Sequence, residues 1–355
     1  MTKKRNIPTK LSIYSVPNVT RPRLSETMID GKEWMSYGAD NLFPDFLWSL
    51  YCDSPTHQAI IDSKVLYTMG AGLSIGKEKA NRKETVSEVI RKCVLDFQLF
   101  GGFAIQVVRD ANGDIAEIWW ADFAKLRTNK DGSMVFWSDD WRSWNVEPKA
   151  FPVYDPESKN PTEIFYYRGA TCRSVYPVCC YMSAIDSIQT EVEVQHWHLN
   201  NIKNNFASNH IINILGAIPD EEERKETEKL INEKFTGSDV AGRLLINWAE
   251  TKDEKMTVDT LGEDSSDKKF MQLAKDVNEK ITIAHRVTSA ILIGRVAESG
   301  FSRLEFQQAF EIFNTTVIKP IQDEFSMCLS KIFPEKEIHF DPFVLPTEKS
   351  ENPTM

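Results

Sequence analysis

Apolar residues recur at helical spacing in three segments of the first hundred residues, which predicts helices at about 43–51, 55–69 and 83–100. Ser54 followed by Pro55 favours a helix start, because serine caps helices and proline is tolerated in the first turn. Asn41 could cap the first helix in the same way. Gly70 and Gly72 are typical of a helix end.

The spacing then changes from helical to alternating, which predicts strands. Phe103–Val108 and Ile115–Trp120 flank an Asn112-Gly113 turn, the pattern of a β-hairpin. Shorter strands are expected at 134–138, 151–154 and 163–168. Five tryptophans occur in this region, and core or interface packing is favoured over a ligand cage: they are Trp119, Trp120, Trp137, Trp141 and Trp144. The first part of the chain is therefore expected to be α+β.

Two apolar stripes at three- and four-residue steps follow, and they predict two long helices packed lengthwise. The first stripe is Ile185, Ile188, Val192, Leu199, Ile202 and Phe206; the second is Phe270, Leu273, Val277, Ile281 and Ala284. Between them, 210–266 has the pattern of a compact insert with a strand, a helix and two further strands. The sequence thus predicts a helix pair that carries a small module.

After the second stripe the chain is expected to bend at His285 and Arg286, pass through an apolar segment ending at Gly294, and form a polar loop. Ser302 with Glu305 three residues later predicts a capping box at the start of a last long helix. Pro320 should kink that helix near its middle. A strand at 337–340 is expected to rejoin the α+β part.

Composition and charge narrow the choice of function. The net charge of −10 argues against a sequence-specific DNA-binding protein but allows one past which DNA slides. The sequence lacks an apolar run long enough to span a membrane and a secretory signal, and its six cysteines indicate reduced thiols. Phosphate-binding, dinucleotide-binding and zinc-protease motifs are absent as well. The composition therefore describes a folded protein without a recognisable catalytic motif.

Candidate chemistry is sparse. Asp139, Asp140 and His196 leave open a metal-dependent nuclease, although an isolated carboxylate pair is more often a turn. His196 and His198 lie two apart and would face different sides of a helix, which disfavours a shared metal ion. His285-Arg286 has two interpretations of equal weight: a positively charged helix end, or a subunit or DNA contact. No metal or cofactor is expected.

Several short strings resemble the portal proteins of tailed double-stranded DNA phages, in particular compact portals from phages and prophages of anaerobic gut bacteria. The strings are 37–44 (YGADNLFP), 54–57 (SPTH), 234–237 (KFTG) and 284–288 (AHRVT). The order of the expected elements carries the resemblance, which covers roughly 35 to 343. It implies an α+β portal fold with a wing, a two-helix stem, an inserted clip, a tunnel loop and a tunnel helix.

Carried over to this chain, the resemblance implies boundaries for each part: 1–25 a flexible arm, 26–182 the wing, 183–209 and 267–294 the two stem helices with the hinge, 210–266 the clip, 295–302 the tunnel loop, 303–333 the tunnel helix, 334–345 a returning wing strand, and 346–355 a disordered tail. Only about a dozen residues follow Phe343, so a helical crown is expected to be short or missing. The expected channel residues are Arg295, Glu298, Ser299, Gly300 and Arg303, and the expected hinge residues are His285, Arg286, Gly294 and Pro320.

The resemblance also implies a function without catalysis. A portal is a ring, usually of twelve copies, at one capsid vertex of the virion, and it is assembled in the bacterial cytoplasm. Double-stranded DNA passes through it during packaging and ejection. Its expected partners are further copies of itself, the terminase large subunit, the major capsid or scaffold protein, and head–tail connector proteins, with no membrane contact. Another virion structural protein, such as a connector or minor capsid protein, remains the main alternative.

Overall fold

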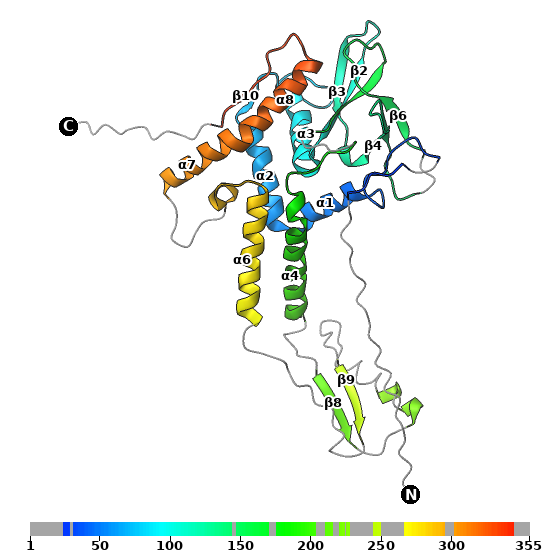
Figure 1. The fold of residues 1–355 in the computed structure, drawn as a ribbon, viewed down its shortest axis with the longest axis vertical. Coiled ribbons are helices and arrows are strands. Elements are labelled where there is room, and N and C mark those ends of the chain that lie inside the picture. Colours follow the sequence, from blue (N-terminus) through cyan, green and yellow to red (C-terminus); the bar gives the residue numbers. More distant parts are fainter. Residues whose placement is uncertain are drawn as a thin grey trace, which may run out of the picture.

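The computed structural model describes residues 24–28, 31–143, 147–169, 175–203, 210–215, 220–223, 225–227, 244–249, 266–294 and 302–343. Figure 1 shows three parts in a row: an α/β body, a column of two helices below it, and a small strand pair beyond the column. Chain segments from both ends of the sequence build the body. The column and the strand pair are therefore an insertion in the chain: the chain leaves the body before the column and returns to the body after it.

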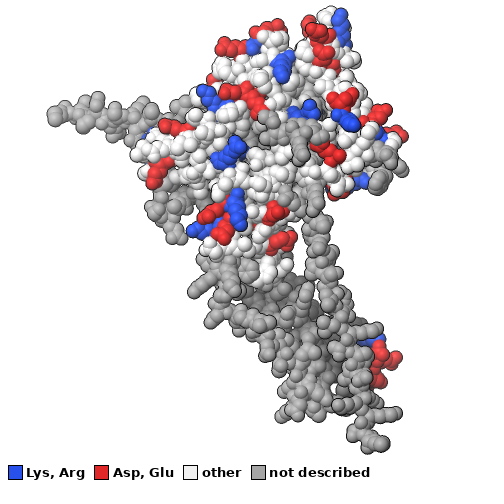
Figure 2. Space-filling model, viewed as in Figure 1, with Lys and Arg blue, Asp and Glu red and all other residues white. Residues whose placement is uncertain are grey.

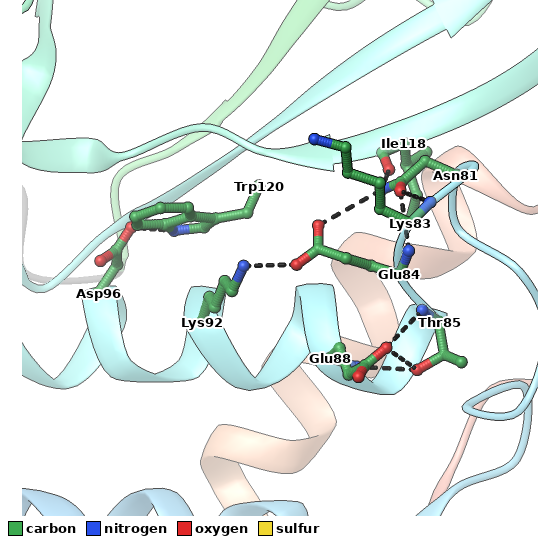
Figure 3. A network of polar contacts seen from close by, with 9 residues as sticks. All are labelled: Asn81, Lys83, Glu84, Thr85, Glu88, Lys92, Asp96, Ile118 and Trp120. Atoms are coloured by element: carbon green, nitrogen blue, oxygen red, sulfur yellow. Dashed lines mark hydrogen bonds and ion pairs between the residues drawn. The ribbon is translucent and has the colours of Figure 1, made fainter.

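Three helices open the body: α1 (Phe43–Asp53), α2 (Pro55–Met69) and α3 (Val86–Phe100). The predicted start at Ser54 is confirmed, and the structure adds a cap at Thr85 that was not predicted. Ser54 Oγ accepts a hydrogen bond from His57 N at 3.2 Å, and Thr85 forms a capping box with Glu88 (Figure 3). The third helix begins three residues later than the apolar pattern predicted, because Thr85 rather than an earlier residue caps it.

The expected cap at Asn41 is wrong. Leu42 occupies the N-cap position of α1 and makes no side-chain cap. Asn41 instead adopts φ 62°, and its Oδ1 accepts hydrogen bonds from Tyr37 N (3.0 Å) and Arg127 Nε (2.6 Å). Its side chain therefore holds the fully buried Arg127 guanidinium inside the body rather than the end of a helix.

Two antiparallel three-stranded sheets complete the body. The first has the order β3-β2-β7, with β2 at Phe103–Arg109, β3 at Ile115–Trp120 and β7 at Thr162–Tyr167. The second has the order β4-β5-β6, with β4 at Leu126–Thr128, β5 at Met134–Trp137 and β6 at Lys149–Pro152. The Asn112-Gly113 hairpin is confirmed, with Gly113 at φ 95°. Helix α3 packs on β2 and β3 and buries one face of the first sheet.

The column consists of α4 (Ile185–Lys203) and α6 (Ser266–Ala284), which pack side by side and run in opposite directions (Figure 1). Between them lie the parallel strands β8 (His210–Leu215) and β9 (Leu244–Ala249), with helical residues at 221–223 and 225–227. A parallel pair needs a crossover connection, which the helical residues between the strands supply. The third strand expected in this insert lies outside the described residues.

The last long helix is interrupted. It consists of α7 (Arg303–Phe313), a π-helical turn (Asn314–Ile318) and α8 (Lys319–Ile332). The capping box of Ser302 and Glu305 is confirmed at its start. The π-helical turn precedes Pro320, a residue that has no N–H to give to the helix ladder. Figure 1 draws α7 and α8 along one slanting line, with α8 against the body.

The chain then returns to the body through β10 (Phe340–Asp341), which begins three residues later than the strand predicted at 337–340 and pairs antiparallel with β1 (Gly72–Leu73). Gly70 ends α2 with φ 54°, and a Cβ there would lie 2.2 Å from the carbonyl oxygen of Asp341. Only glycine permits this close approach. The end of α2 is thereby fixed to the last described strand.

One hydrophobic core joins the body to the near end of the column. Ile185 and Ile188 of α4, and Val277 and Ile281 of α6, belong to the same buried cluster as Phe313 and Phe325. The near end of the column is therefore part of the body's core. Among the described residues, no helix is long and apolar enough to cross a membrane.

Candidate functional site

The predicted hinge lies where α2, α4 and α6 meet. The N-terminus of α2 holds the other two helices through side chains: the Ser54 hydroxyl donates to Glu191 of α4, and Thr56 Oγ1 lies 2.5 Å from Glu191 Oε1. Thr56 Oγ1 also lies 3.1 Å from Oδ1 of Asn278 in α6. One turn of α2 therefore bonds to both helices of the column. We refer to this region, with the residues described next, as the helix junction.

Two histidines from distant parts of the sequence meet at the helix junction. His57 Nδ1 of α2 lies 2.9 Å from His285 Nε2, directly after α6, and both side chains are at most 1% exposed. The Tyr181 ring stacks on His285 with centroids 5.0 Å apart, and its hydroxyl donates to Leu99 O at 2.7 Å. A hydrogen bond between two imidazoles needs one ring nitrogen as acceptor, so at least one of the two rings is neutral.

Burial also favours the neutral form of both histidines. It lowers the pKa of His57 to about 3, with a smaller contribution from Lys64. Burial, followed by the charges of Lys64 and His57, lowers the pKa of His285 well below its usual value. Both histidines are neutral at pH 7. Of the predicted pair His285-Arg286, a positive charge at the end of α6 therefore comes from the exposed Arg286, and neither interpretation of the pair is decided.

Lys64 and Cys180 complete the helix junction. Lys64 is only 3% exposed, and its Nζ lies 3.5 Å from Cys180 Sγ. Cys180 Sγ in turn lies 4.0 Å from His285 Nδ1. Among the described residues no carboxylate forms an ion pair with Lys64. The charge of this lysine adds to burial in keeping both histidines unprotonated.

Helix α6 ends in a Schellman motif. Arg286 N donates to Ile283 O at 2.9 Å, and Val287 N donates to Thr282 O at 3.1 Å. Arg286 has φ 57°, the left-handed conformation that glycine usually supplies at this position. Arg286 is itself exposed. The hinge is therefore a tight, hydrogen-bonded turn, and its one charged residue faces outward.

The segment after the turn is bonded on two sides. Residues Ala290–Ile293 form a 3₁₀ turn that ends at Gly294, with φ 81°. Leu292 O accepts a hydrogen bond from the Tyr67 hydroxyl of α2 at 2.9 Å. Thr288 Oγ1 donates to Ala309 O of α7 at 3.0 Å. The hinge thus connects α2, α6 and α7 through both backbone and side chains.

Of the predicted channel residues, Arg295, Glu298, Ser299 and Gly300 lie outside the described residues. Arg303 is the first residue of α7 and is exposed. Pro320 lies in the first turn of α8, exposed, behind the π-helical turn. The structure thus places His285 in the helix junction, Arg286 directly after it, Gly294 at the end of the following 3₁₀ turn, and Arg303 and Pro320 on the last helix.

Sequence reasoning missed His57, Lys64, Cys180 and Tyr181 as members of this cluster. His57 occurs in one of the strings that carry the portal resemblance and His285 in another. That coincidence was the only signal, because 228 residues separate the two histidines. A hydrogen bond between such distant positions leaves no local pattern.

The alternative metal site finds no support in the geometry. Asp139 Oδ1 forms an ion pair with Lys125 Nζ at 2.8 Å in the body, whereas His196 lies on α4 in the column. Within the described part of the chain, no three metal-ligating side chains come together. Asp139, Asp140 and His196, all of them described, therefore do not form a nuclease centre.

Solved structures share this architecture. A chain from the virion of a native gene transfer agent particle superposes with a TM-score of 0.54 and 14% identity, covering 84% of this chain and 83% of that chain. A chain from the neck of the native particle, computed with C12 symmetry, gives 0.55, 14%, 84% and 82% for the same measures. A chain from the neck of the empty particle, computed with C6 symmetry, gives 0.55, 14%, 84% and 84%. At this identity the likeness establishes a shared fold.

Comparison of the sequence with known proteins identifies the family. No curated protein matches the chain significantly. The family model described as "Phage portal protein" matches residues 72–348, well over half of the 355 residues. The match includes β1, the column, the hinge and the last helix, and it stops short of α1 and α2 at the N-terminal side. The chain therefore belongs to the phage portal protein family.

Proposed function

We propose that copies of this chain form a closed ring at one vertex of a phage capsid, and that double-stranded DNA passes through the ring during packaging and ejection. The proposal rests on one observation above all. This chain belongs to the portal family, and its structure has a body, an antiparallel two-helix column and an insert at the far end of that column. In a ring, repeated columns would surround an axial channel.

The parts of the structure receive roles in this proposal. The body, within 26–182 and 334–345, is the wing, and α4 and α6 are the stem. The insert 210–266 is the clip, 295–302 the tunnel loop, and α7 with α8 the tunnel helix. Between Arg303 and Ile318 the only charged residues are Arg303, Glu305 and Glu311. Few positive charges on this helix would let DNA move past it without binding tightly.

Exposed apolar side chains support ring formation. On the column and α7, large apolar side chains remain exposed in the single chain: Trp197 41%, Leu199 47%, Leu273 38%, Ile283 72% and Ile312 55%. Such side chains on neighbouring helices are typical of protein interfaces. A cyclic ring needs a heterologous interface, in which one face of a subunit meets a different face of the next. The twelvefold ring is the stoichiometry that we propose.

The ring would bind the packaging terminase and later the head–tail connector, and it would be incorporated with major capsid or scaffold protein. The proposed function is structural and conducting, and ATP hydrolysis would belong to the terminase. No observation favours a connector or minor capsid protein over a portal.

Electron microscopy of the purified protein together with its mass in solution tests the proposal. Rings with a central hole and a mass of about twelve chains are expected; closed particles without a channel would contradict it.

The proposed tunnel loop has its own test. Deletion of Glu298–Gly300 should leave the ring mass unchanged but lower DNA retention or packaging in a complementation assay. Ring assembly would survive because the helix junction and the column lie outside the deletion. Failure of the deletion variant to assemble would show that 295–302 belongs to the subunit interface instead.

A further inference from the structure

A cavity of about 610 Å³ lies on the body, away from the helix junction, between α1, α3 and the segments around β4 and β5. This volume is in the range of ligand-binding pockets. Its apolar surface comes from Trp48, Leu95, Phe100 and Trp120, and Trp48 is 46% exposed. We call it the α1–α3 cavity. The portal function proposed above makes no use of it.

Carboxylates outnumber cations around the α1–α3 cavity. Its lining includes Asp45, Asp96, Asp122, Asp139 and Asp140, against Lys92, Lys125 and Arg142. Two of the three cations are already engaged: Lys125 pairs with Asp139 at 2.8 Å and Lys92 with Glu84 at 2.5 Å, the latter visible in Figure 3. The cavity therefore has an excess of negative charge.

Asp96 is the least solvated of these carboxylates, at 4% exposed. Its Oδ2 accepts a hydrogen bond from Trp120 Nε1 at 2.8 Å (Figure 3) and another from Phe123 N at 3.2 Å. No hydrogen-bond donor among the described residues reaches its Oδ1. Asp96 Oδ1 is therefore left to accept a hydrogen bond from a cationic group that enters the cavity.

The carboxylates also act on one another. Burial, and then the charge of Asp122, raise the pKa of Asp96 well above its usual value. Burial, and more weakly the charges of Asp45 and Asp139, raise the pKa of Asp122. Ionisation of each of these carboxyl groups therefore costs free energy beside the others. A positively charged occupant would reverse that effect.

The chain itself contains a segment of matching chemistry. Residues 1–23 hold six Lys and Arg residues and no Asp or Glu, and they also include Ile7, Leu11, Ile13 and Tyr14. The segment joins the body close to the cavity: Ser25 O accepts a hydrogen bond from Gly38 N at 2.9 Å, and Leu42 lines the cavity. Twenty-three residues can span up to about 75 Å when extended, which is ample for this distance.

We propose that the α1–α3 cavity binds the basic segment 1–23 of this chain. A Lys or Arg side chain of the segment faces Asp45, Asp96 and Asp122, and its apolar side chains pack on Trp48 and Leu95. The apolar contacts supply burial and the charges supply specificity. The segment thereby fastens itself to the body, and this contact does not depend on the ring.

Photo-cross-linking in the full-length chain tests the proposal. A benzoylphenylalanine in place of Tyr14 should cross-link to the cavity segments 42–48 and 92–100, as mapped by mass spectrometry. The double variant Asp45→Asn with Asp122→Asn should reduce the yield at least five-fold, and the new amide oxygen at position 122 can still accept the hydrogen bond from Ala124 N. The exposed Asp323→Asn on α8 is the matched control and should leave the yield unchanged.

A second variant set covers the case in which the cavity variant fails to fold. Replacement of Lys3, Lys4, Arg5 and Lys10 by Glu alters only the segment and should reduce the same cross-links to a similar extent. A product of single-chain mass is expected, whereas a product of double mass would assign the segment to the cavity of a neighbouring copy and overturn the proposal. Cross-links that map outside the cavity, or yields that neither variant set changes, would overturn the proposal.

Discussion

The two ends of the α4–α6 column differ in how they are held. At the near end, Ile188 and Ile281 are fully buried, and Glu191 accepts hydrogen bonds from the start of α2. Farther along, Leu199 and Leu273 are 47% and 38% exposed, although both belong to the apolar stripes that predicted the helix pair. The same sequence pattern therefore gives a completed core at one end and an open apolar surface at the other.

This difference distinguishes the apolar residues that stabilise the folded chain from those that are left for assembly. An apolar stripe on a helix says that the face will be covered, but not by which chain. The near end is covered by this chain's own body. We attribute the open stripe at the far end to neighbouring copies in the ring, where burial of these side chains would stabilise assembly rather than the single chain.

The largest expected effect tests that attribution. The double variant Leu199→Asp with Leu273→Asp should abolish ring formation, because two charges would be buried at the proposed interface. Mass photometry should then show single chains while the circular dichroism spectrum stays that of a folded protein. Leu66→Asp is the control, since Leu66 is equally exposed (49%) but lies on α2 in the body. Intact rings in the double variant would place the interface elsewhere.

At the near end the effect should appear in stability instead. Ile281→Ala leaves a cavity in the core and should lower the free energy of unfolding by about 2–5 kcal/mol. Leu273→Ala on the same helix should lower it by less than about 1 kcal/mol. Urea unfolding in the ring-deficient background measures both without a contribution from assembly. Equal losses from the two variants would remove the distinction between the two ends.

The buried histidines make the near end sensitive to acid. Their pKa values are lower in the folded chain than in the unfolded one, so the unfolded chain binds more protons below about pH 6.5. Stability is therefore complete above pH 6.5 and decreases as the pH falls toward 3. For His57 the loss between pH 6.5 and 5 should be about 1.5–2 kcal/mol.

His57→Phe should flatten this pH dependence, although it also lowers stability at pH 7 by leaving His285 without its partner. Comparison of the two proteins is needed because Asp96, whose pKa is raised, contributes with the opposite sign: its share is present at low pH and is lost as the pH rises. Thermal unfolding from pH 7.5 to 4.5 provides the measurement. The exposed His339→Gln should keep the wild-type slope, and a variant His57→Phe with that same slope would refute the assignment.

Much of the fold followed from local patterns, because helix caps and turns depend on neighbouring residues. Ser54-Pro55, Ser302 with Glu305, and Asn112-Gly113 all form the structures that their sequences predict. The helix junction could not be predicted, because His57 and His285 meet only after the body has folded. Asn41 was misassigned for the same reason: its partner Arg127 lies 86 residues away. The predicted channel residues at 295–300 fall outside the described residues and stay predictions.

The smallest expected effect concerns the turn that ends α6. Arg286 has a left-handed conformation that costs an L-residue about 1 kcal/mol, and glycine avoids this cost while adding some entropy to the unfolded chain. Arg286→Gly should therefore leave stability unchanged or raise it by up to about 1 kcal/mol, whereas Arg286→Val, with its branched Cβ, should lower it. Lys280→Gly, inside α6, is the control and should cost about 1 kcal/mol. Urea unfolding distinguishes the signs. A loss on Arg286→Gly as large as that on Lys280→Gly would show that the arginine side chain, rather than the backbone of the turn, stabilises the near end of the column.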